Sequence, residues 1–388
     1  MTRVDADVLV AGAGPVGLAV AVLAATSGFD VLVADPRVDQ AGGEPIDKAC
    51  GEGLLPLGLR RLRGLGVDPP GRPLAGIRYL RATGGPTADA RFRAGPGRGV
   101  RRTVLQGALA ARAAGAGVAV IRGAVVGLAQ DERAVAVRLR GDGGEAVVRA
   151  RWLVGADGLH SLVRRTSGLA GVAPRRARYA LRRHVAVSPW TDFVEVHWAP
   201  HAEAYVTPVA DDLVGVALLC RGRPGSWDAG FAAFPRLAER LGAAASAGPV
   251  PGAGPLRGAG PVRGAGPLRG AGPVRGAGPV RGAGPLRQVS RRRVAGRVLL
   301  VGDAAGYVDA LTGEGISVGV AQAQALVGAL RLGDPQQYER AWWAVTRRYR
   351  VLTGALVGAA GHPLVRPLIV PAARRLPPAY AALVNLLE

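Results

Sequence analysis

The sequence predicts an α/β fold with an inserted antiparallel β-sheet domain and a helical C-terminal tail. Three observations lead to this prediction. Short apolar runs at residues 8–11, 31–34 and 298–301 are typical of buried parallel strands. Regularly spaced strand patterns between residues 179 and 220 indicate an antiparallel sheet. From residue 336 onward the chain has helical spacing.

A glycine-rich turn follows the first apolar strand. Gly12, Gly14 and Gly17 form G-x-G-x-x-G, with Pro15 inside the motif, and a helix is expected over residues 18–27. Gly12 permits a tight turn, Gly14 lets a pyrophosphate approach the backbone, and Gly17 allows the helix to pack closely on the strand. The helix N-terminus offers unpaired N–H groups and the positive end of a dipole to phosphates.

The second strand of this unit ends in an acid. Asp35 follows residues 31–34 and lies 18 residues beyond Gly17, where a carboxylate can accept both hydroxyls of an adenosine ribose. Strand, glycine motif, helix, strand and acid in this order predict a Rossmann-like dinucleotide-binding domain. The alternative is a signal peptide or a membrane helix, because residues 8–29 carry no charge, but three glycines and a proline interrupt the run.

Composition sets outer bounds. The 388 residues are enough for a large core, in two closely joined domains, and the formal net charge is +22. The charge is almost entirely arginine, scattered and without a nucleic-acid motif, so we expect no nucleic-acid partner. Loose peripheral contact with an anionic membrane remains an alternative. Cys50 and Cys220 have no disulfide or metal spacing, and a reduced cytoplasmic protein is the default expectation.

The segment that follows the second strand contains two candidate catalytic residues. Lys48 is the only lysine in an arginine-biased chain, which suggests a role for a compact point charge; chance is the alternative. Cys50 begins the stretch C-G-E-G and either faces a bound ring system or is a small buried residue. His197 and His201 lie on a strand and a turn, where they do not converge, so we expect no metal site.

The middle of the chain alternates short elements. A hairpin is expected at 77–83 and 88–94. An Ala-rich helix is expected to begin within residues 101–106, which include Arg102 and Gln106. The parallel sheet resumes at 118–121. The remaining strand predictions are a meander at 124–129, 134–140 and 146–154, then strands at 179–187, 192–198, 203–209 and 213–220.

The segment D-G-x-x-S-x-x-R follows the last strand of the meander. It is filled by Asp157, Gly158, Ser161 and Arg164, with a helix expected from about residue 160. Farther along, residues 227–241 have the spacing of one amphipathic helix.

Residues 252–287 are six copies of GAGP[LV]R. Their glycine and proline content favours an extended, solvated linker, and we expect only the last copy to be structural because it runs directly into a strand. Binding of anionic partners by the repeat is the minority interpretation.

A second ligand-type element occurs late in the chain. The strand at 298–301 delivers Gly302 and Asp303. A glycine-bracketed helix start follows, and the helix continues to about residue 332; its opening residues are Gly313, Glu314, Gly315 and Ile316. A carboxylate and free N–H groups then lie at the carboxyl edge of the sheet, where ligands bind in open α/β sheets.

Together, the glycine fingerprint, the D-G-x-x-S-x-x-R segment and the late G-D-A-A helix start resemble the flavin-binding elements of single-component aromatic hydroxylases, the group A flavoprotein monooxygenases of the para-hydroxybenzoate hydroxylase type. They are also similar to those of geranylgeranyl-reductase-like flavoproteins. The resemblance spans most of the chain except the repeat and the tail. It implies a Rossmann-like FAD-binding domain of the GR2 type and a bound FAD.

By this resemblance, the ADP half of FAD is held by Gly12, Gly14, Pro15, Gly17 and Asp35. Arg102 and Gln106 resemble residues that approach the ribityl chain and the flavin.

Three later positions complete the implied site. Asp157 is similar to the aspartate that bridges flavin and nicotinamide functions, and Asp303 to the one on the ribityl hydroxyls. The helix opening at 313–316 aims its dipole at the flavin N1–C2=O edge, which favours the anionic reduced flavin.

Departures from the hydroxylase pattern keep two activities open. Gly306, Asp309 and Ala310 stand where hydroxylases commonly have a histidine and prolines, and Ser317 where an asparagine is usual. The segments T-G-E-G-I and C-G-E-G are more similar to the sequences of the prenyl-reductase branch. Asp309 is our candidate for handling a proton, because it precedes the helix expected to abut the flavin; a loop-capping aspartate is the alternative.

The resulting hypothesis is an FAD-dependent monooxygenase that uses NAD(P)H and O2 and hydroxylates an apolar aromatic or polyketide-like substrate through a flavin C4a-hydroperoxide. NAD(P)H docks transiently in this scheme. The alternatives are an FAD-dependent reductase of isoprenoid double bonds and a flavin-binding scaffold without turnover. The catalytic candidates are Lys48, Cys50 and Asp309.

The predicted division of the chain is FAD-binding domain in three parts (1–78, 97–172, 288–333), substrate-domain hairpin (79–96), substrate-binding sheet (173–250), repeat linker (251–287) and C-terminal helices (334–388).

Overall fold

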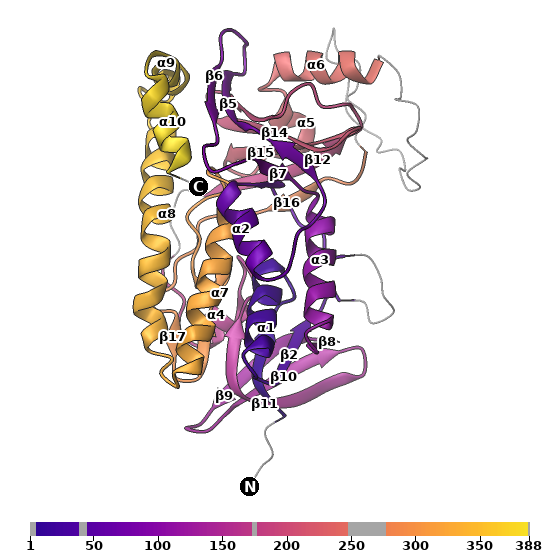
Figure 1. Ribbon diagram of the computed structural model, residues 1–388, viewed down its shortest axis with the longest axis vertical. Helices are drawn as coiled ribbons and strands as arrows, with labels where there is room; N and C mark the ends of the chain where they lie inside the picture. The colour runs from indigo at the N-terminus through magenta and orange to yellow at the C-terminus, as the bar shows by residue number, and fades with distance from the viewer. Residues whose placement is uncertain (1–4, 39–44, 173–176, 247–276, 387–388) are drawn as a thin grey trace.

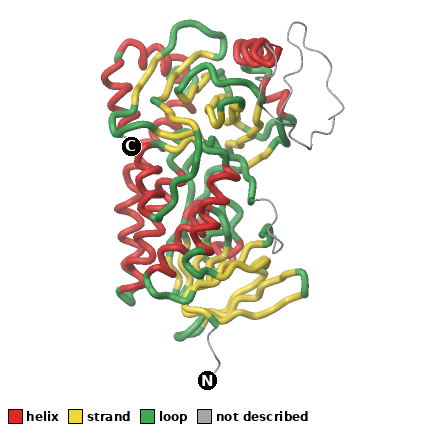
Figure 2. The backbone as a smooth tube through the Cα atoms, turned by 45° about the vertical axis from the view of Figure 1, so that its right-hand side comes forward, coloured by secondary structure: helices red, strands yellow, loops and turns green. Residues whose placement is uncertain are grey.

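The computed structural model describes residues 5–38, 45–172, 177–246 and 277–386. Two sheets lie at opposite ends of an elongated molecule, and the long helix α8 (Gln337–Gly361) runs along one side (Figure 1). Figure 2 shows the strands gathered at the two ends with the helical layer beside them. The predicted α/β fold with a second sheet and a helical tail is confirmed.

The lower sheet has eight strands, and its central strands are parallel. The order is β17-β18-β11-β1-β2-β8, with β10 and β9 branching from β11. The bounds are β1 Ala6–Ala11, β2 Val31–Asp35, β8 Ala119–Arg122, β9 Ala124–Gln130, β10 Val135–Gly141, β11 Gly144–Gly155, β17 Val294–Ala295 and β18 Val298–Leu300.

Strand β11 belongs to two arrangements at once. Its first half pairs antiparallel with β10, and its second half pairs parallel with β1 and β18. Val8, Leu9 and Val10 of the central strand β1 are fully buried. Helices cover this sheet, which is why its strands read as continuous apolar runs rather than alternating ones.

Four helices flank the lower sheet. They are α1 (Pro15–Thr26), α3 (Arg102–Ala114), α7 (Gly315–Arg331) and α8. Helix α1 packs against both α3 and α7, and α7 against α8. The carboxyl ends of β1, β11 and β18 therefore open toward the start of α1 and the start of α7.

The upper sheet has seven strands in the order β16-β12-β15-β14-β13-β5-β6. Neighbours are antiparallel except β5 and β13, which pair parallel. Residues 281–283 form β16 and pair with β12. Gly282 and Ala283 belong to the last copy of the repeat, which we expected to be structural, whereas residues 252–276, expected to be an extended linker, lie outside the described residues. The bounds are β5 Gly76–Arg81, β6 Ala88–Arg91, β12 Arg178–Val185, β13 Phe193–Trp198, β14 Ala202–Ala210, β15 Leu213–Arg221 and β16 Arg281–Ala283.

One helix prediction was wrong, and another predicted helix is short. The single helix expected over 227–241 is two helices, α5 (Trp227–Phe231) and α6 (Pro235–Ser246). Pro235 explains the break, because proline disfavours helical backbone at the preceding residue and is tolerated only in the first turn. The helix expected from about residue 160 is the single short turn α4 (Leu162–Thr166).

Smaller elements join the two ends. A three-stranded sheet of β3 (Gly53–Leu54), β7 (Gly97–Gly99) and β4 (Arg72–Leu74) lies beside α2 (Pro56–Gly64). At the top, α9 (Ile369–Arg375) and α10 (Pro377–Asn385) cover β5 and β6 (Figure 1), and η2 (Arg366–Leu368) connects α8 to α9. Tyr380 of α10 packs on Tyr79 of β5, with ring centroids 4.7 Å apart.

Candidate active site

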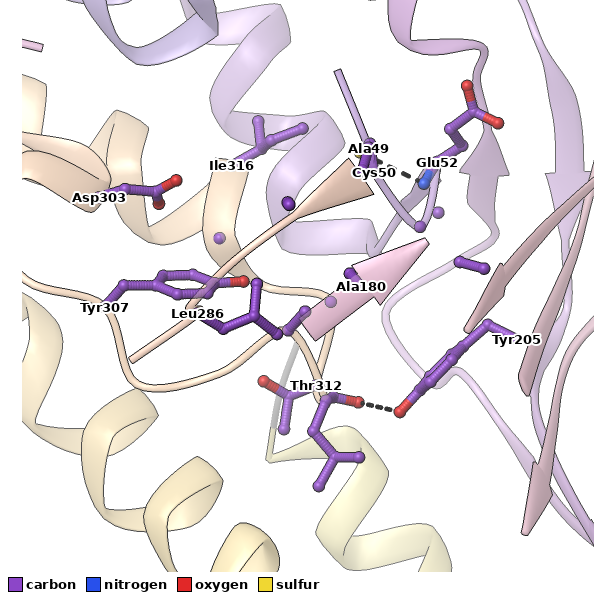
Figure 3. A pocket seen from close by; sticks show the side chains of 18 of the residues that line it. Ala49, Cys50, Glu52, Ala180, Tyr205, Leu286, Asp303, Tyr307, Thr312 and Ile316 are labelled. Carbon is purple, nitrogen blue, oxygen red and sulfur yellow. Dashed lines mark hydrogen bonds between the residues drawn. The ribbon is translucent and has the colours of Figure 1, made fainter. Parts of the chain in front are cut away.

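A large cavity lies between the two sheets, and residues from distant parts of the chain line it. Its volume is about 2050 Å³, counting the part that opens to solvent. Gly14, Asp157 and Asp303 all lie on its wall (Figure 3 shows Asp303 among the lining residues). A second cavity of about 930 Å³ adjoins it and contains Gly12 and Asp35. The two share wall residues and therefore form one elongated crevice; the shared residues are Arg37, Lys48, Asp157, Leu159 and Ala283.

The glycine motif leaves room in one direction only. A Cβ on Gly12 would lie 2.5 Å from the Ala156 carbonyl oxygen, and one on Gly17 would lie 1.9 Å from the Gly12 carbonyl oxygen. A Cβ on Gly14 would meet nothing within 4 Å. Gly12 and Gly17 are therefore required by packing within the protein, whereas Gly14 leaves open space on the crevice wall.

Two helix N-termini border this crevice. Helix α1 begins next to Gly14 and helix α7 next to Glu314, and neither has a side-chain cap or an acidic residue in its first turn. Their first N–H groups and positive dipole ends therefore have no anionic side chain of the helix's own first turn. Gly302, Gly313, Gly315 and Ile316, which belong to the late motif, line the same cavity. The arrangement suits a ligand with two separate electron-rich groups.

Asp35 is buried, with 1% of its surface exposed, and its carboxylate is occupied by its own chain. It accepts hydrogen bonds from the Ala13 N–H (2.9 Å) and from the backbone and side chain of Arg37. Burial opposes ionisation, but the contacts with Arg37 and Ala13 outweigh it and hold the pKa of Asp35 below its ordinary value. Arg37, which the sequence analysis did not single out, brings a guanidinium to the crevice wall.

Asp157 and Asp303 face the crevice with unequal partners. Asp157 Oδ2 accepts from the N–H groups of Leu162 (2.7 Å) and Val163 (3.1 Å). Its Oδ1 is buried and has no hydrogen-bond partner within the described residues, so a ligand hydroxyl there would satisfy it. Asp303 Oδ2 lies 3.6 Å from Lys48 Nζ, and both side chains are about one-third exposed.

Arg102 and Gln106 support the glycine motif from α3. Arg102 lines the cavity and donates to Gln106 Oε1 (3.1 Å). Gln106 lies behind it and donates to the Ala13 carbonyl. The predicted pair is therefore brought together, with Arg102 facing the crevice and Gln106 fixing the loop.

The loop that carries Cys50 is held by buried polar contacts. Cys50 lies on the cavity wall, and burial raises the pKa of its thiol (Figure 3). Glu52 has a left-handed φ of 59°, and its N–H donates to Cys50 Sγ (3.4 Å). Glu52 Oε2 lies 2.7 Å from His184 Nε2, and His184 Nδ1 lies 3.0 Å from the Arg182 guanidinium, which also pairs with Asp47. Sequence reasoning missed this chain of contacts, because its members are far apart in sequence.

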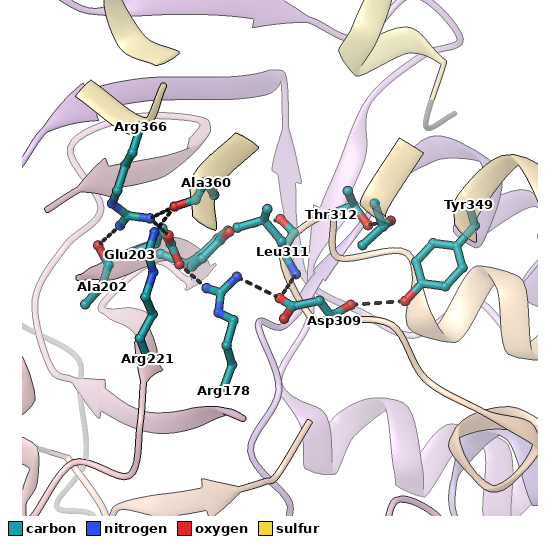
Figure 4. A network of polar contacts seen from close by, with 12 residues as sticks. Arg178, Ala202, Glu203, Arg221, Asp309, Leu311, Thr312, Tyr349, Ala360 and Arg366 are labelled. Atoms are coloured by element: carbon teal, nitrogen blue, oxygen red, sulfur yellow. Dashed lines mark hydrogen bonds and ion pairs between the residues drawn. The ribbon is translucent and has the colours of Figure 1, made fainter. Parts of the chain in front are cut away.

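Asp309 does not line the cavity. It is buried behind the wall, where its carboxylate lies 3.2 Å from Arg178 and accepts from the Leu311 N–H (3.1 Å). Burial raises the pKa of Asp309 to about 6. Arg178 also pairs with Glu203, which pairs with Arg366 of the tail (Figure 4). Asp309 is thus part of an anchor between the upper sheet and the C-terminal helices, a position that gives no support to proton handling at the cavity.

The neighbouring Glu314 is also absent from the wall, although it stands at the start of α7. It is buried, one carboxylate oxygen has no partner within the described residues, and burial raises its pKa to about 7.

His197 lies 3.2 Å from Glu195 in β13. Across the described part of the chain, no group of three or more His, Cys, Asp or Glu side chains could hold a metal ion.

The far half of the cavity is apolar. Aliphatic and aromatic side chains of the upper sheet form one wall, and α8 and α10 form another; these residues are Ile77, Tyr79, Val194, Val196, Leu219, Leu352, Leu356, Leu383 and Val384. The Tyr205 hydroxyl donates to the Leu311 carbonyl (2.9 Å), so this tyrosine presents its ring rather than a free hydroxyl (Figure 3). The crevice therefore changes from backbone polar groups and charges to hydrocarbon along its length.

Residues 5–211, more than half of the chain, match the model of the FAD-binding domain family. The chain belongs to this family. The predicted resemblance to FAD-dependent oxidoreductases and the FAD cofactor are thereby confirmed. The residues present also fit FAD, because the open face of Gly14, the two uncapped helix starts and the unpaired oxygen of Asp157 all lie along one elongated crevice.

Proteins named as reductases are among the curated relatives of this chain. Digeranylgeranylglycerophospholipid reductase 2 of Methanopyrus kandleri is 30% identical over 224 residues, which are 56% of this chain and 55% of that protein. The chain thus aligns with about half the length of that relative.

Two solved structures share the fold at low identity. p-Nitrophenol 4-monooxygenase from Pseudomonas putida has a TM-score of 0.70 and 18% identity, covering 100% of this chain and 96% of that one. A geranylgeranyl bacteriochlorophyll reductase-like protein from Thermoplasma acidophilum has a TM-score of 0.70 and 20% identity, covering 97% and 91%.

Proposed function

We propose that this protein is an FAD-dependent reductase that saturates carbon–carbon double bonds in a lipophilic, isoprenoid-type substrate. One observation carries the proposal: the cofactor crevice continues into an apolar cavity, and Cys50 lies on the wall of that cavity. Similarity to a protein named as a digeranylgeranylglycerophospholipid reductase supports the same substrate class. The C-G-E-G wording points the same way.

In this proposal, different residues of the chain bind different parts of the cofactor. The loop from Gly12 to Gly17 and the start of α1 would bind the pyrophosphate, and Arg37 would contact the adenosine ribose. Asp303 would bind the ribityl hydroxyls. Residues 313–316, at the start of α7, would stabilise negative charge on the flavin ring. FAD, when bound and reduced by NAD(P)H, supplies a hydride equivalent.

Saturating the double bond also requires a proton. One new C–H bond is formed from the hydride and the other from a proton donor on the protein, while the π bond is lost. Cys50 suits this role, because its thiol carries a proton and lies on the wall of the apolar cavity. The contacts of Glu52 and Asp47 at either side hold the loop that presents it. The apolar walls exclude water from the reacting carbons.

Oxygen-dependent hydroxylation of an apolar aromatic or polyketide-like substrate is the second candidate. The fold shared with p-nitrophenol 4-monooxygenase is compatible with it, and the uncapped start of α7 would stabilise negative charge on the cofactor in this reaction as well. Cys50 has no role in that chemistry. The two candidates therefore differ in their need for oxygen and for this thiol.

The deciding experiment compares turnover with and without oxygen. The purified flavoprotein is given NAD(P)H and either geranylgeranyl lipids or phenols, and products are analysed by mass spectrometry. We expect addition of two hydrogens to the lipid in anaerobic buffer. A product that gains one oxygen atom only in air would instead establish the second candidate.

Paired cysteine variants test the proton donor. Cys50→Ala should lower kcat at least about 100-fold with FAD still bound, because general acids contribute on that scale. Cys220→Ala is the matched control, since Cys220 is buried in the upper sheet away from the cavity wall. Wild-type turnover by Cys50→Ala would remove Cys50 from the mechanism.

An isoprenoid lipid resides in a bilayer. We therefore infer that this protein, as a cytoplasmic enzyme, contacts a membrane peripherally.

A further inference from the structure

The C-terminal helices have an unusual charge pattern. Residues 340–387 contain no aspartate or glutamate. The same stretch contains seven arginines, which are Arg340, Arg347, Arg348, Arg350, Arg366, Arg374 and Arg375. Arg366 is buried on Glu203, but Arg374 and Arg375, in the last turn of α9, are exposed. This part of the chain therefore presents positive charge without any neighbouring acid of its own.

Large apolar side chains are exposed in the same stretch of the chain as these arginines. Leu364 is 76% exposed, Leu368 59% and Leu376 59%. All three lie in the connection from α8 to α10, within the thirteen residues 364–376. They flank Arg374 and Arg375 in sequence. We call Leu364, Leu368, Arg374, Arg375 and Leu376 the tail surface. Exposed leucines interleaved with arginines are the composition of segments that lie in a membrane interface.

The helices on either side of the tail surface, α8 before it and α10 after it, form part of the cavity wall. Leu352 and Leu356 of α8 and Leu383 and Val384 of α10 line the apolar half of the cavity. On α8, the exposed positions between 351 and 358 are Val351, Gly354, Ala355 and Gly358, which carry no polar side chain. One layer of helix therefore separates the substrate cavity from an outer face that is apolar or positively charged.

We infer that the tail surface docks on the anionic leaflet of a bilayer. The positive charge without acid complements anionic headgroups, and the leucines can enter the interface. A second copy of this chain is disfavoured as the occupant, because self-association would bring Arg374 and Arg375 against like charge. The location rests on the proposed function in one respect: it sets the cavity that would take a lipid chain next to the bilayer that holds it.

Within the described residues, no helix is by itself long and apolar enough to cross a membrane. Helix α8 and residues 366–375 meet that criterion only as a pair bent by 108°.

Vesicle binding of the full-length flavoprotein tests the inference. We would measure co-sedimentation with vesicles of phosphatidylcholine alone and with 30% phosphatidylglycerol, at low and high salt. We expect binding to the anionic vesicles that salt weakens. Leu364→Asp with Leu368→Asp should lower the partition coefficient at least about tenfold, because each leucine that enters the membrane interface contributes strongly to the free energy of binding. Arg374→Gln with Arg375→Gln should lower it roughly fivefold per arginine on anionic vesicles only.

The matched control for each single Leu→Asp change is Leu332→Asp, at a leucine that is 70% exposed after α7. Retained flavin absorbance and an unchanged melting temperature would show that each variant folds. Equal loss of binding by Leu332→Asp, or no binding by the wild type, would overturn the inference. So would a tail-surface variant that converts a dimer to a monomer while vesicle binding is unchanged.

The assay contains no substrate, so its outcome is separable from the proposed function. Binding to anionic vesicles that the tail-surface variants weaken, without any lipid reduction, would support the docking surface and refute the reductase. Lipid reduction in detergent without vesicle binding would do the reverse.

Discussion

The glycine loop offers a sharp test, because two of its glycines should fail in opposite ways. Gly14 has ordinary extended backbone, with φ −70° and ψ 173°, and a Cβ there would meet no atom within 4 Å. Gly14→Ala should therefore leave the apoprotein as stable as the wild type or more stable by up to about 1 kcal/mol. The added methyl group would occupy the space that the cofactor's phosphates need.

The magnitudes follow from these contacts. A methyl group forced into a filled site costs about 1–3 kcal/mol, which corresponds to roughly 5- to 150-fold weaker FAD binding by Gly14→Ala. In Gly17→Ala the new Cβ would lie 1.9 Å from the Gly12 carbonyl oxygen, so the strand and helix must separate. That cost falls on the fold itself, and we expect the apoprotein to melt at least several degrees lower.

Two measurements on each variant separate the effects: thermal unfolding of the apoprotein by circular dichroism, and FAD affinity by titration of flavin fluorescence. Gly358→Ala is the control, because it adds the same methyl group into open space on the exposed face of α8, away from the cavity. Wild-type FAD affinity in Gly14→Ala would refute the placement of the pyrophosphate. A destabilised Gly14→Ala apoprotein would refute the assignment of its open space.

Three further predictions concern carboxylates. Asp303→Ala should lose most of its flavin, measured as the absorbance ratio of flavin to protein, whereas Asp309→Ala should keep it because Asp309 lies off the cavity wall. Burial raises the pKa of Glu314 to about 7, so the folded state binds the extra proton and stability falls as pH rises from about 4.5 to 7; Glu314→Gln should remove this loss, on the order of 3 kcal/mol, from the pH dependence of urea unfolding. Glu52→Ala leaves His184 and the Arg102 N–H without their buried partner, so it should destabilise the protein by about 3 kcal/mol and lower kcat; an unchanged urea midpoint would contradict the network.

Local pattern was sufficient to predict the parallel strands, the glycine loop and the start of α7. Each is a short segment whose apolar run or glycine spacing specifies its own backbone, and parallel topology then brings their carboxyl ends together. This is why the sequence alone could place Gly14, Asp157 and Asp303 around one cavity.

Side-chain direction and long-range pairing could not be predicted in the same way. Asp309 lies six residues after Asp303, yet the intervening turn directs it to Arg178 behind the wall. Arg37 reaches the crevice because it pairs with Asp35, a contact that the motif does not specify. The bond between Glu52 and His184 joins positions 132 residues apart, and no periodicity in the sequence reports such a distance. The parallel pairing of β5 with β13 also joins segments that are far apart in the sequence, so no local pattern predicts it.

The walls of the substrate cavity are completed by residues made late in synthesis. Gly14 leaves the ribosome early, but Leu352, Leu356, Leu383 and Val384 belong to α8 and α10. During translation the nascent protein can therefore build its first strands and glycine loop while the hydrocarbon half of the cavity still lacks one side. Nascent chains halted before residue 352 would expose the apolar faces of β5, β13 and β15 to water, and these are the intermediates on which a chaperone would be expected to act.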